Sequence, residues 1–129
     1  METGVAAGYS AAAFLQALRT NGQGRLYSSD FPYFRLSQPE KYIGAVVRPE
    51  LRTNWDLHLE GDRNNLKKIL RKLSGIDILH YDYDKSFRGR RNTMRLVIRL
   101  AGEPGLTVMD DIGDNSYFHD LVHDASSKR

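Results

Sequence analysis

Stretches with the pattern of a strand alternate with stretches of helical periodicity along almost the whole of this chain. The strand candidates are short, and most are followed by a segment whose apolar residues recur every three or four positions. Such alternation predicts an α/β fold in which a mostly parallel, Rossmann-like sheet carries helices on both faces. The strands are expected over residues 25–30, 55–60, 76–81 and 106–109, with a partial first strand ending at Glu2.

The segments between these strands predict helices and one irregular region. Pro32, Pro39 and Pro49 interrupt residues 31–54, which we expect to be irregular apart from a helix over residues 40–47. The length suits one domain, which we place at residues 1–124, followed by a frayed tail at residues 125–129. The other helices are expected over residues 9–20, 64–73, 87–100 and 116–123.

Every expected strand ends in an acidic residue or is followed by one within two residues. In an open parallel sheet the carboxyl ends of the strands lie along one edge, and ligands bind beyond that edge. A single acid there is explained as a helix cap or a loop residue, but acids at all five strand ends favour a site. These acids are Glu2, Asp30, Asp62, Asp82, Asp110 and Asp111.

Two glycines, Gly4 and Gly8, lie between the first strand end and the first expected helix. Glycine allows a ligand to approach the backbone closely, and free N–H groups at a helix start can face polar ligand atoms. The spacing differs from the tighter Gly-x-Gly-x-x-Gly turn that receives the pyrophosphate of a dinucleotide. The turn therefore favours a nucleotide-like cofactor without a pyrophosphate.

Charge and composition restrict the partners that we expect. The chain has 19 basic and 16 acidic residues, and its basic stretches suit solvated helix faces, so nucleic acid is not an expected partner. It has no cysteine, which excludes disulfides and thiolate metal sites and suits a reducing cytoplasm. Its apolar runs are too short to span a bilayer, so we expect a soluble, cytoplasmic protein.

Taken in order, these motifs resemble those of the class I S-adenosylmethionine-dependent methyltransferases. Within that class the chain looks most similar to the small-molecule O-methyltransferase-like group that uses a divalent metal. The resemblance extends from Glu2 to about Leu121, and it implies S-adenosylmethionine as the cofactor and a small molecule as the substrate. It rests on ETGVAAGYS at residues 2–10, LYSSDFP at 26–32, LEGD at 59–62, LHYDYDKS at 79–86 and VMDDI at 108–112.

The resemblance implies which residues would bind the cofactor. Asp30 would accept hydrogen bonds from both ribose hydroxyls, and Gly61 with Asp62 would lie beside the adenine. An N-cap of the following helix is an equally good interpretation of Asp62. The glycine turn and the helix start would form the floor of the pocket through Glu2, Gly4, Gly8, Tyr9 and Ser10.

The resemblance also implies a divalent-cation site formed by Asp82, Asp110 and Asp111. Their carboxylate oxygens are hard ligands that suit Mg²⁺, Mn²⁺ or Ca²⁺. Lys85, three residues after Asp82, stands where catechol-type enzymes carry the base that accepts the proton of the acceptor hydroxyl. The implied catalytic residues are thus Lys85 and Asp82, and the alternative for Lys85 is a surface lysine paired with Asp84.

Compared with the family, the chain begins late in the first strand and ends before the closing antiparallel strands, so we expect a fold truncated at both ends. Three functions remain open. The first is transfer of a methyl group from S-adenosylmethionine to an oxygen of a small molecule, with metal assistance. The others are a non-catalytic cofactor-binding or interaction module and an NAD-type dinucleotide-binding domain. A homo-oligomer is compatible with each of them.

Overall fold

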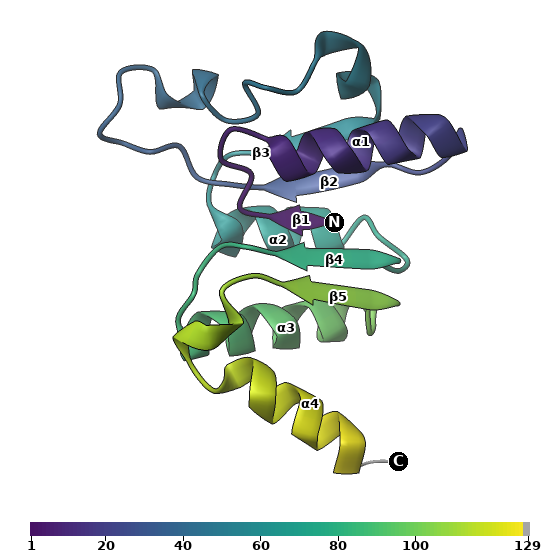
Figure 1. Ribbon diagram of the computed structural model, residues 1–129, viewed down its shortest axis with the longest axis vertical. Coiled ribbons are helices and arrows are strands. Elements are labelled where there is room, and N and C mark those ends of the chain that lie inside the picture. Colours follow the sequence, from purple (N-terminus) through teal and green to yellow (C-terminus); the bar gives the residue numbers. More distant parts are fainter. Residues whose placement is uncertain (128–129) are drawn as a thin grey trace.

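The computed structural model describes residues 1–127, with side chains to residue 124, and is built around a five-stranded sheet (Figure 1). All neighbouring strands are parallel, and their order across the sheet is β3-β2-β1-β4-β5. The predicted parallel α/β architecture is therefore confirmed. The strands are β1 (Glu2–Thr3), β2 (Leu26–Ser29), β3 (Trp55–His58), β4 (Ile78–Tyr81) and β5 (Leu106–Met109).

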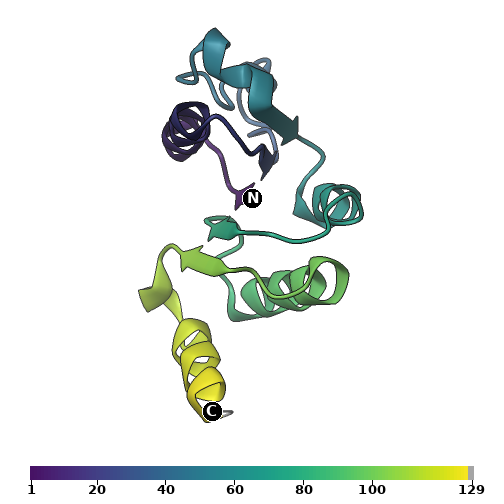
Figure 2. The same ribbon diagram turned by 90° about the vertical axis from the view of Figure 1, so that its right-hand side faces the viewer.

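Helices cover both faces of the sheet (Figure 2). Helix α1 (Tyr9–Asn21) lies on one face, and α2 (Asp62–Leu70) and α3 (Phe87–Ala101) lie together on the other. This division follows from right-handed crossovers, because the chain moves from β1 outward to β3 and then returns to β4 and β5. Helix α4 (Tyr117–Ser127) follows β5 and contacts α3.

Apolar side chains form one core under α1 and another under α2 and α3. Burial of these side chains is the main stabilising contribution to a domain of this size. The core under α1 includes Val5, Ala11, Leu15, Leu26, Val47 and Leu51. The core under α2 and α3 includes Leu66, Leu70, Leu79, Tyr81, Met94 and Val97.

The predicted helix over residues 40–47 is wrong. Two short 3₁₀ turns, η1 (Pro39–Lys41) and η2 (Pro49–Asn54), stand in this region. Gly44 interrupts a helical path, because its φ is +69° and a Cβ there would lie 2.2 Å from the ring of Trp55. Close packing of the loop on Trp55 therefore overrides the local helical pattern.

Two helix boundaries also differ from the prediction. Helix α2 begins at Asp62 instead of residue 64, because the Gly61 carbonyl accepts the N–H groups of Asn64 and Asn65. Helix α4 continues to Ser127, so the expected frayed tail is helical over residues 125–127, and residues 128–129 lie outside the described residues. Within residues 1–127, no helix has the length and apolar character that a bilayer crossing requires.

Candidate functional site

The carboxyl ends of all five strands lie along one edge of the sheet, on the left in Figure 1. Asp30, Asp82 and Asp110 each donate a backbone N–H to the last residue of a neighbouring strand, at 2.9, 3.0 and 3.0 Å. The ladder thus continues one residue beyond the strands. These predicted strand-end acids are fixed along a single edge.

The glycine turn after β1 packs against the protein's own backbone. A Cβ on Gly4 would lie 1.8 Å from the carbonyl oxygen of Asp82, and one on Gly8 would lie 2.7 Å from the Cα of Gly44. Both glycines have positive φ, +76° and +97°, which disfavours any other residue. The turn requires glycine at both positions before any ligand is considered.

Asp30 holds this turn against the end of β2. Its Oδ2 accepts the N–H groups of Val5 at 2.8 Å and Ala6 at 2.7 Å, and its Oδ1 accepts the N–H of Phe31 at 2.6 Å. A carboxylate has about four acceptor positions, so three bonds leave one for a ligand. The bond to Ala6 also supports a non-glycine residue at a φ of +46°.

Glu2 lies beneath the turn and supports it. Its two carboxylate oxygens accept the hydroxyl groups of Ser10 at 2.5 Å and Ser28 at 2.9 Å, and its side chain is fully buried. Burial raises the pKa of Glu2 above its ordinary value, although these hydrogen bonds oppose the shift. Glu2 is enclosed here and supports the turn from beneath, and its place in the cofactor pocket stays a prediction. Tyr9, at the helix start, is 77% exposed.

Asp62 is a buried carboxyl group beside a cleft. Its Oδ1 accepts the hydroxyl of Ser29 at 2.5 Å, whereas Oδ2 is buried and has no hydrogen-bond partner among the described residues. Burial raises the pKa of Asp62 to about 6. Gly61, not Asp62, is at the N-cap of α2, so the N-cap interpretation of Asp62 is wrong.

The cleft beside Asp62 has a volume of about 780 Å³, and its lining includes Phe31, which the sequence did not indicate as a site residue. Phe31 and Tyr83 contribute aromatic rings to it, next to Gly61. Asn65 fixes the cleft from behind, because its Nδ2 donates to Ser29 Oγ and to the carbonyls of Asp30 and His58. An amide within the apolar stripe of α2 was the signal available for Asn65, since buried polar groups need partners.

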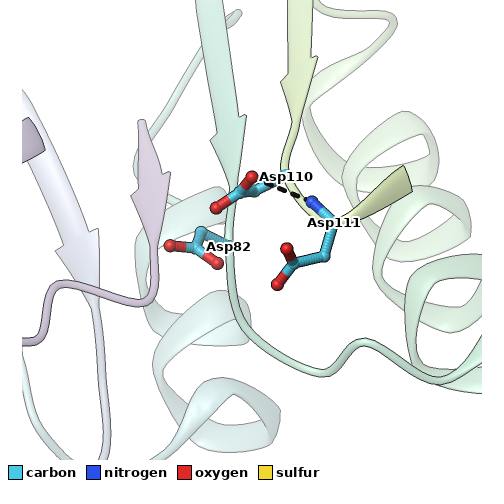
Figure 3. Close-up of side chains that lie close together, drawn as sticks. All are labelled: Asp82, Asp110 and Asp111. Carbon is cyan, nitrogen blue, oxygen red and sulfur yellow. Dashed lines mark hydrogen bonds between the residues drawn. The ribbon is translucent and has the colours of Figure 1, made fainter. Parts of the chain in front are cut away.

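Asp82, Asp110 and Asp111 come together as the sequence analysis predicted (Figure 3). Each residue offers a carboxylate oxygen within 4.8 Å of those of the other two. Asp82 follows β4, and Asp110 and Asp111 follow β5, its parallel neighbour. Asp110 Oδ1 also accepts the N–H of Asp111 at 2.9 Å, which fixes the two side chains relative to each other.

Arg90 of α3 holds the chain that carries two of these acids. One terminal nitrogen, Nη2, donates to the carbonyl of Asp110 at 3.1 Å and to that of Asp111 at 2.7 Å. The Arg90 side chain is fully buried, and Asp111 has a φ of +48°. The buried guanidinium therefore stabilises a turn that a non-glycine residue adopts reluctantly.

Lys85 joins the acidic cluster and does not pair with Asp84. Its Nζ contacts Asp82 Oδ1 and lies 2.9 Å from Asp111 Oδ2. Partial burial lowers the pKa of Lys85, but the bonds and charges of Asp82 and Asp111 outweigh it and raise the pKa above its ordinary value. In this arrangement Lys85 is a charged ammonium, not a free base.

The cluster has the chemistry of a hard-cation site. Its candidate ligand atoms are all oxygens, and Asp110 and Asp111 are exposed to solvent. The positively charged Lys85 ammonium is already bound there by Asp82 and Asp111. The Asp62 cleft differs, because it is lined by aromatic side chains and by Asp62, whose buried Oδ2 has no hydrogen-bond partner among the described residues. The strand edge thus combines an acceptor for a polar amine or hydroxyl with a cluster that attracts cations.

The comparisons with known proteins gave one finding. A family model described as a methyltransferase domain matches residues 1–112. No curated protein and no solved structure matches the chain.

Proposed function

Because this chain belongs to the methyltransferase domain family, as a class I S-adenosylmethionine-dependent member, we propose that it methylates an oxygen of a small molecule with the help of a divalent cation. Methyl transfer from S-adenosylmethionine is the activity of the class. The oxygen acceptor, the cation and the residue roles below are our proposal.

The observation that carries the proposal is the contact between the glycine turn and the acidic cluster. Gly4 packs directly on the carbonyl of Asp82, whose side chain belongs to the cluster. A cofactor on the turn and an acceptor at the cluster would therefore be neighbours. Group transfer requires such proximity between the donor and the acceptor.

The residues present suit the cofactor. The unpartnered Asp62 Oδ2 can accept an exocyclic amine, and the aromatic rings of Phe31 and Tyr83 can pack against a purine. Asp30 has one acceptor position left for a hydroxyl while it holds the turn. When bound, S-adenosylmethionine supplies an electrophilic methyl group on a sulfonium.

Asp82, Asp110 and Asp111 would hold the divalent cation. A cation there would lower the pKa of an acceptor hydroxyl and so favour its nucleophilic form. The three carboxylates fix the place of the charge, and Arg90 fixes the turn that carries two of them. Lys85 supplies a mobile ammonium beside the acceptor oxygen, and it can donate a hydrogen bond there.

Calorimetric titration tests the cofactor assignment directly. We expect S-adenosylhomocysteine, the product form of the cofactor, to bind, and NAD to give no heat above dilution. The reverse result would support a dinucleotide-binding domain. Binding of S-adenosylhomocysteine without methyl transfer to any hydroxyl compound in a panel would support a non-catalytic module.

Asp62 should oppose folding while it supports cofactor binding. The pKa rises from 3.8 in the reference state to about 6, so the native state holds the proton more tightly and loses stability as the pH rises through about 6. We expect Asp62→Asn to increase the free energy of unfolding by about 2 kcal/mol at pH 7.5 and by almost nothing at pH 4.

The same substitution should weaken binding of S-adenosylhomocysteine, because an amide nitrogen cannot accept the amine. For the wild-type protein, affinity should fall as the pH falls through about 6 and Asp62 takes up a proton. Chemical denaturation and calorimetry between pH 4 and 8 measure both effects. An Asp62→Asn protein that binds as tightly as wild type would remove Asp62 from the cofactor site.

A divalent cation should stabilise the fold through the acidic cluster. Mutual repulsion of three carboxylates is relieved by Mg²⁺ or Mn²⁺, and a ligand that binds only the native state raises its stability. We expect millimolar Mg²⁺ to raise the melting temperature by a few degrees, and Asp110→Asn to remove most of that increase. Asp114→Asn is the control, because Asp114 is an exposed acid of η3 (Ile112–Asp114) outside the cluster. Equal responses in both variants would show that the cluster holds no cation.

A further inference from the structure

The ammonium group of Lys85 bridges two of the three carboxylates in the cluster. It contacts Asp82 and Asp111, and both of these offer oxygens within 4.8 Å of each other and of Asp110. The two contacts join residues that follow different strands, β4 and β5. Lys85 is therefore a counter-ion of the cluster itself, because both of its partners are cluster residues.

The backbone keeps Lys85 at this place. Asn115 Nδ2 donates to the Lys85 carbonyl at 2.7 Å, and Asn115 Oδ1 accepts the Tyr117 N–H at the start of α4 at 3.1 Å. Only the long side chain is free to leave, and it is about one-third exposed, at 30%. The ammonium can therefore swing into solvent without any change in the main chain.

A divalent cation that bound the carboxylate oxygens contacted by Lys85 would compete with its ammonium for them. The cluster carries three negative charges, and the positive charges near it are those of Lys85 and of Arg90, whose Nη2 is committed to backbone carbonyls. Lys85 is thus the cation that an incoming ion must replace. If the Lys85 ammonium stayed in place, it and the bound divalent cation would repel each other.

We propose that Lys85 is a tethered competitor of the divalent cation, so that loading of the cluster requires the lysine side chain to leave Asp82 and Asp111. This inference rests on the cation site of the proposed function. It adds that the chain sets its own cation affinity through Lys85. When the cluster holds no ion, the lysine then offsets one of its three negative charges.

The test is Mn²⁺ binding to the purified protein, measured by calorimetry and by the electron paramagnetic resonance signal of free Mn²⁺. Lys85→Met should bind Mn²⁺ about three- to tenfold more tightly than wild type. In wild type, Mn²⁺ must first break the partly exposed ion pairs of Lys85 with Asp82 and Asp111, and the variant has no such pairs. Lys85→Arg retains the charge and should remain within about twofold of wild type. Lys68→Met is the matched control, because Lys68 pairs with Glu60 at 2.6 Å, away from the cluster.

A readout without metal accompanies the titration. In the presence of a chelator, Lys85→Met should melt at a lower temperature than wild type, because three carboxylates then lack the ammonium as a counter-ion. Addition of Mn²⁺ should remove this difference in melting temperature. Equal or weaker Mn²⁺ binding by Lys85→Met would overturn the competitor role while leaving the cation site intact. Absence of Mn²⁺ binding in every variant would overturn both, and titration with S-adenosylhomocysteine in the same calorimeter would still decide the cofactor assignment.

Discussion

Replacement of Gly4 by alanine is expected to abolish the folded state or to bring it close to its limit of stability. The new Cβ would lie 1.8 Å from the carbonyl oxygen of Asp82, a residue whose backbone N–H donates to the Thr3 carbonyl at the end of β1. Relief would require these strand ends to separate. The loss should exceed about 4 kcal/mol, a large share of the total for a small domain.

Gly22→Ala is the matched control for this prediction. Gly22 also has a positive φ, +69°, but no heavy atom lies within 4 Å of the position that its Cβ would take. Its replacement should cost about 1 kcal/mol, from the backbone conformation alone. Urea unfolding followed by circular dichroism measures both variants. Similar losses in the two would show that Gly4 is needed for its φ and not for its contact with Asp82.

Replacement of Asp30 by alanine is expected to weaken both the cofactor site and the fold. It removes the acceptor of three backbone N–H groups, of which that of Val5 is buried. Bonds to a charged acceptor contribute about 1.5 to 3 kcal/mol each, and an unpaired buried donor adds its desolvation cost. We expect a loss of about 3 kcal/mol in stability and at least thirtyfold weaker binding of S-adenosylhomocysteine, equivalent to about 2 kcal/mol.

Asp77→Ala controls for loss of a negative charge. Asp77 is exposed and precedes β4, at the opposite edge of the sheet. It should leave the affinity for S-adenosylhomocysteine unchanged. If Asp30→Ala keeps the affinity of wild type while losing stability, Asp30 acts on the fold alone, and the ribose contact implied by the family resemblance does not exist.

The sequence by itself determined the layers of the fold and the meeting of the acids. The spacing of apolar residues located the four α-helices of the described residues, although not the 3₁₀ turn η3, and β5 has the predicted bounds, because these patterns depend on neighbours in the chain. Parallel strands end at a common edge, so Asp82, Asp110 and Asp111 could be placed together without coordinates. Residues 31–54 were the exception, since their path depends on packing between Gly44 and Trp55.

Only the tertiary structure decided what each polar side chain binds. The sequence left Lys85 as a base or as a partner of Asp84, and its partners are Asp82 and Asp111. Asp30 was assigned to a ligand, but most of its acceptor capacity is taken by the N–H groups of the glycine turn and of Phe31. A carboxylate or an ammonium has no preferred partner within its own segment. Its bonds are set by the donors and acceptors that distant segments bring within about 3 Å, and only the packed chain determines these.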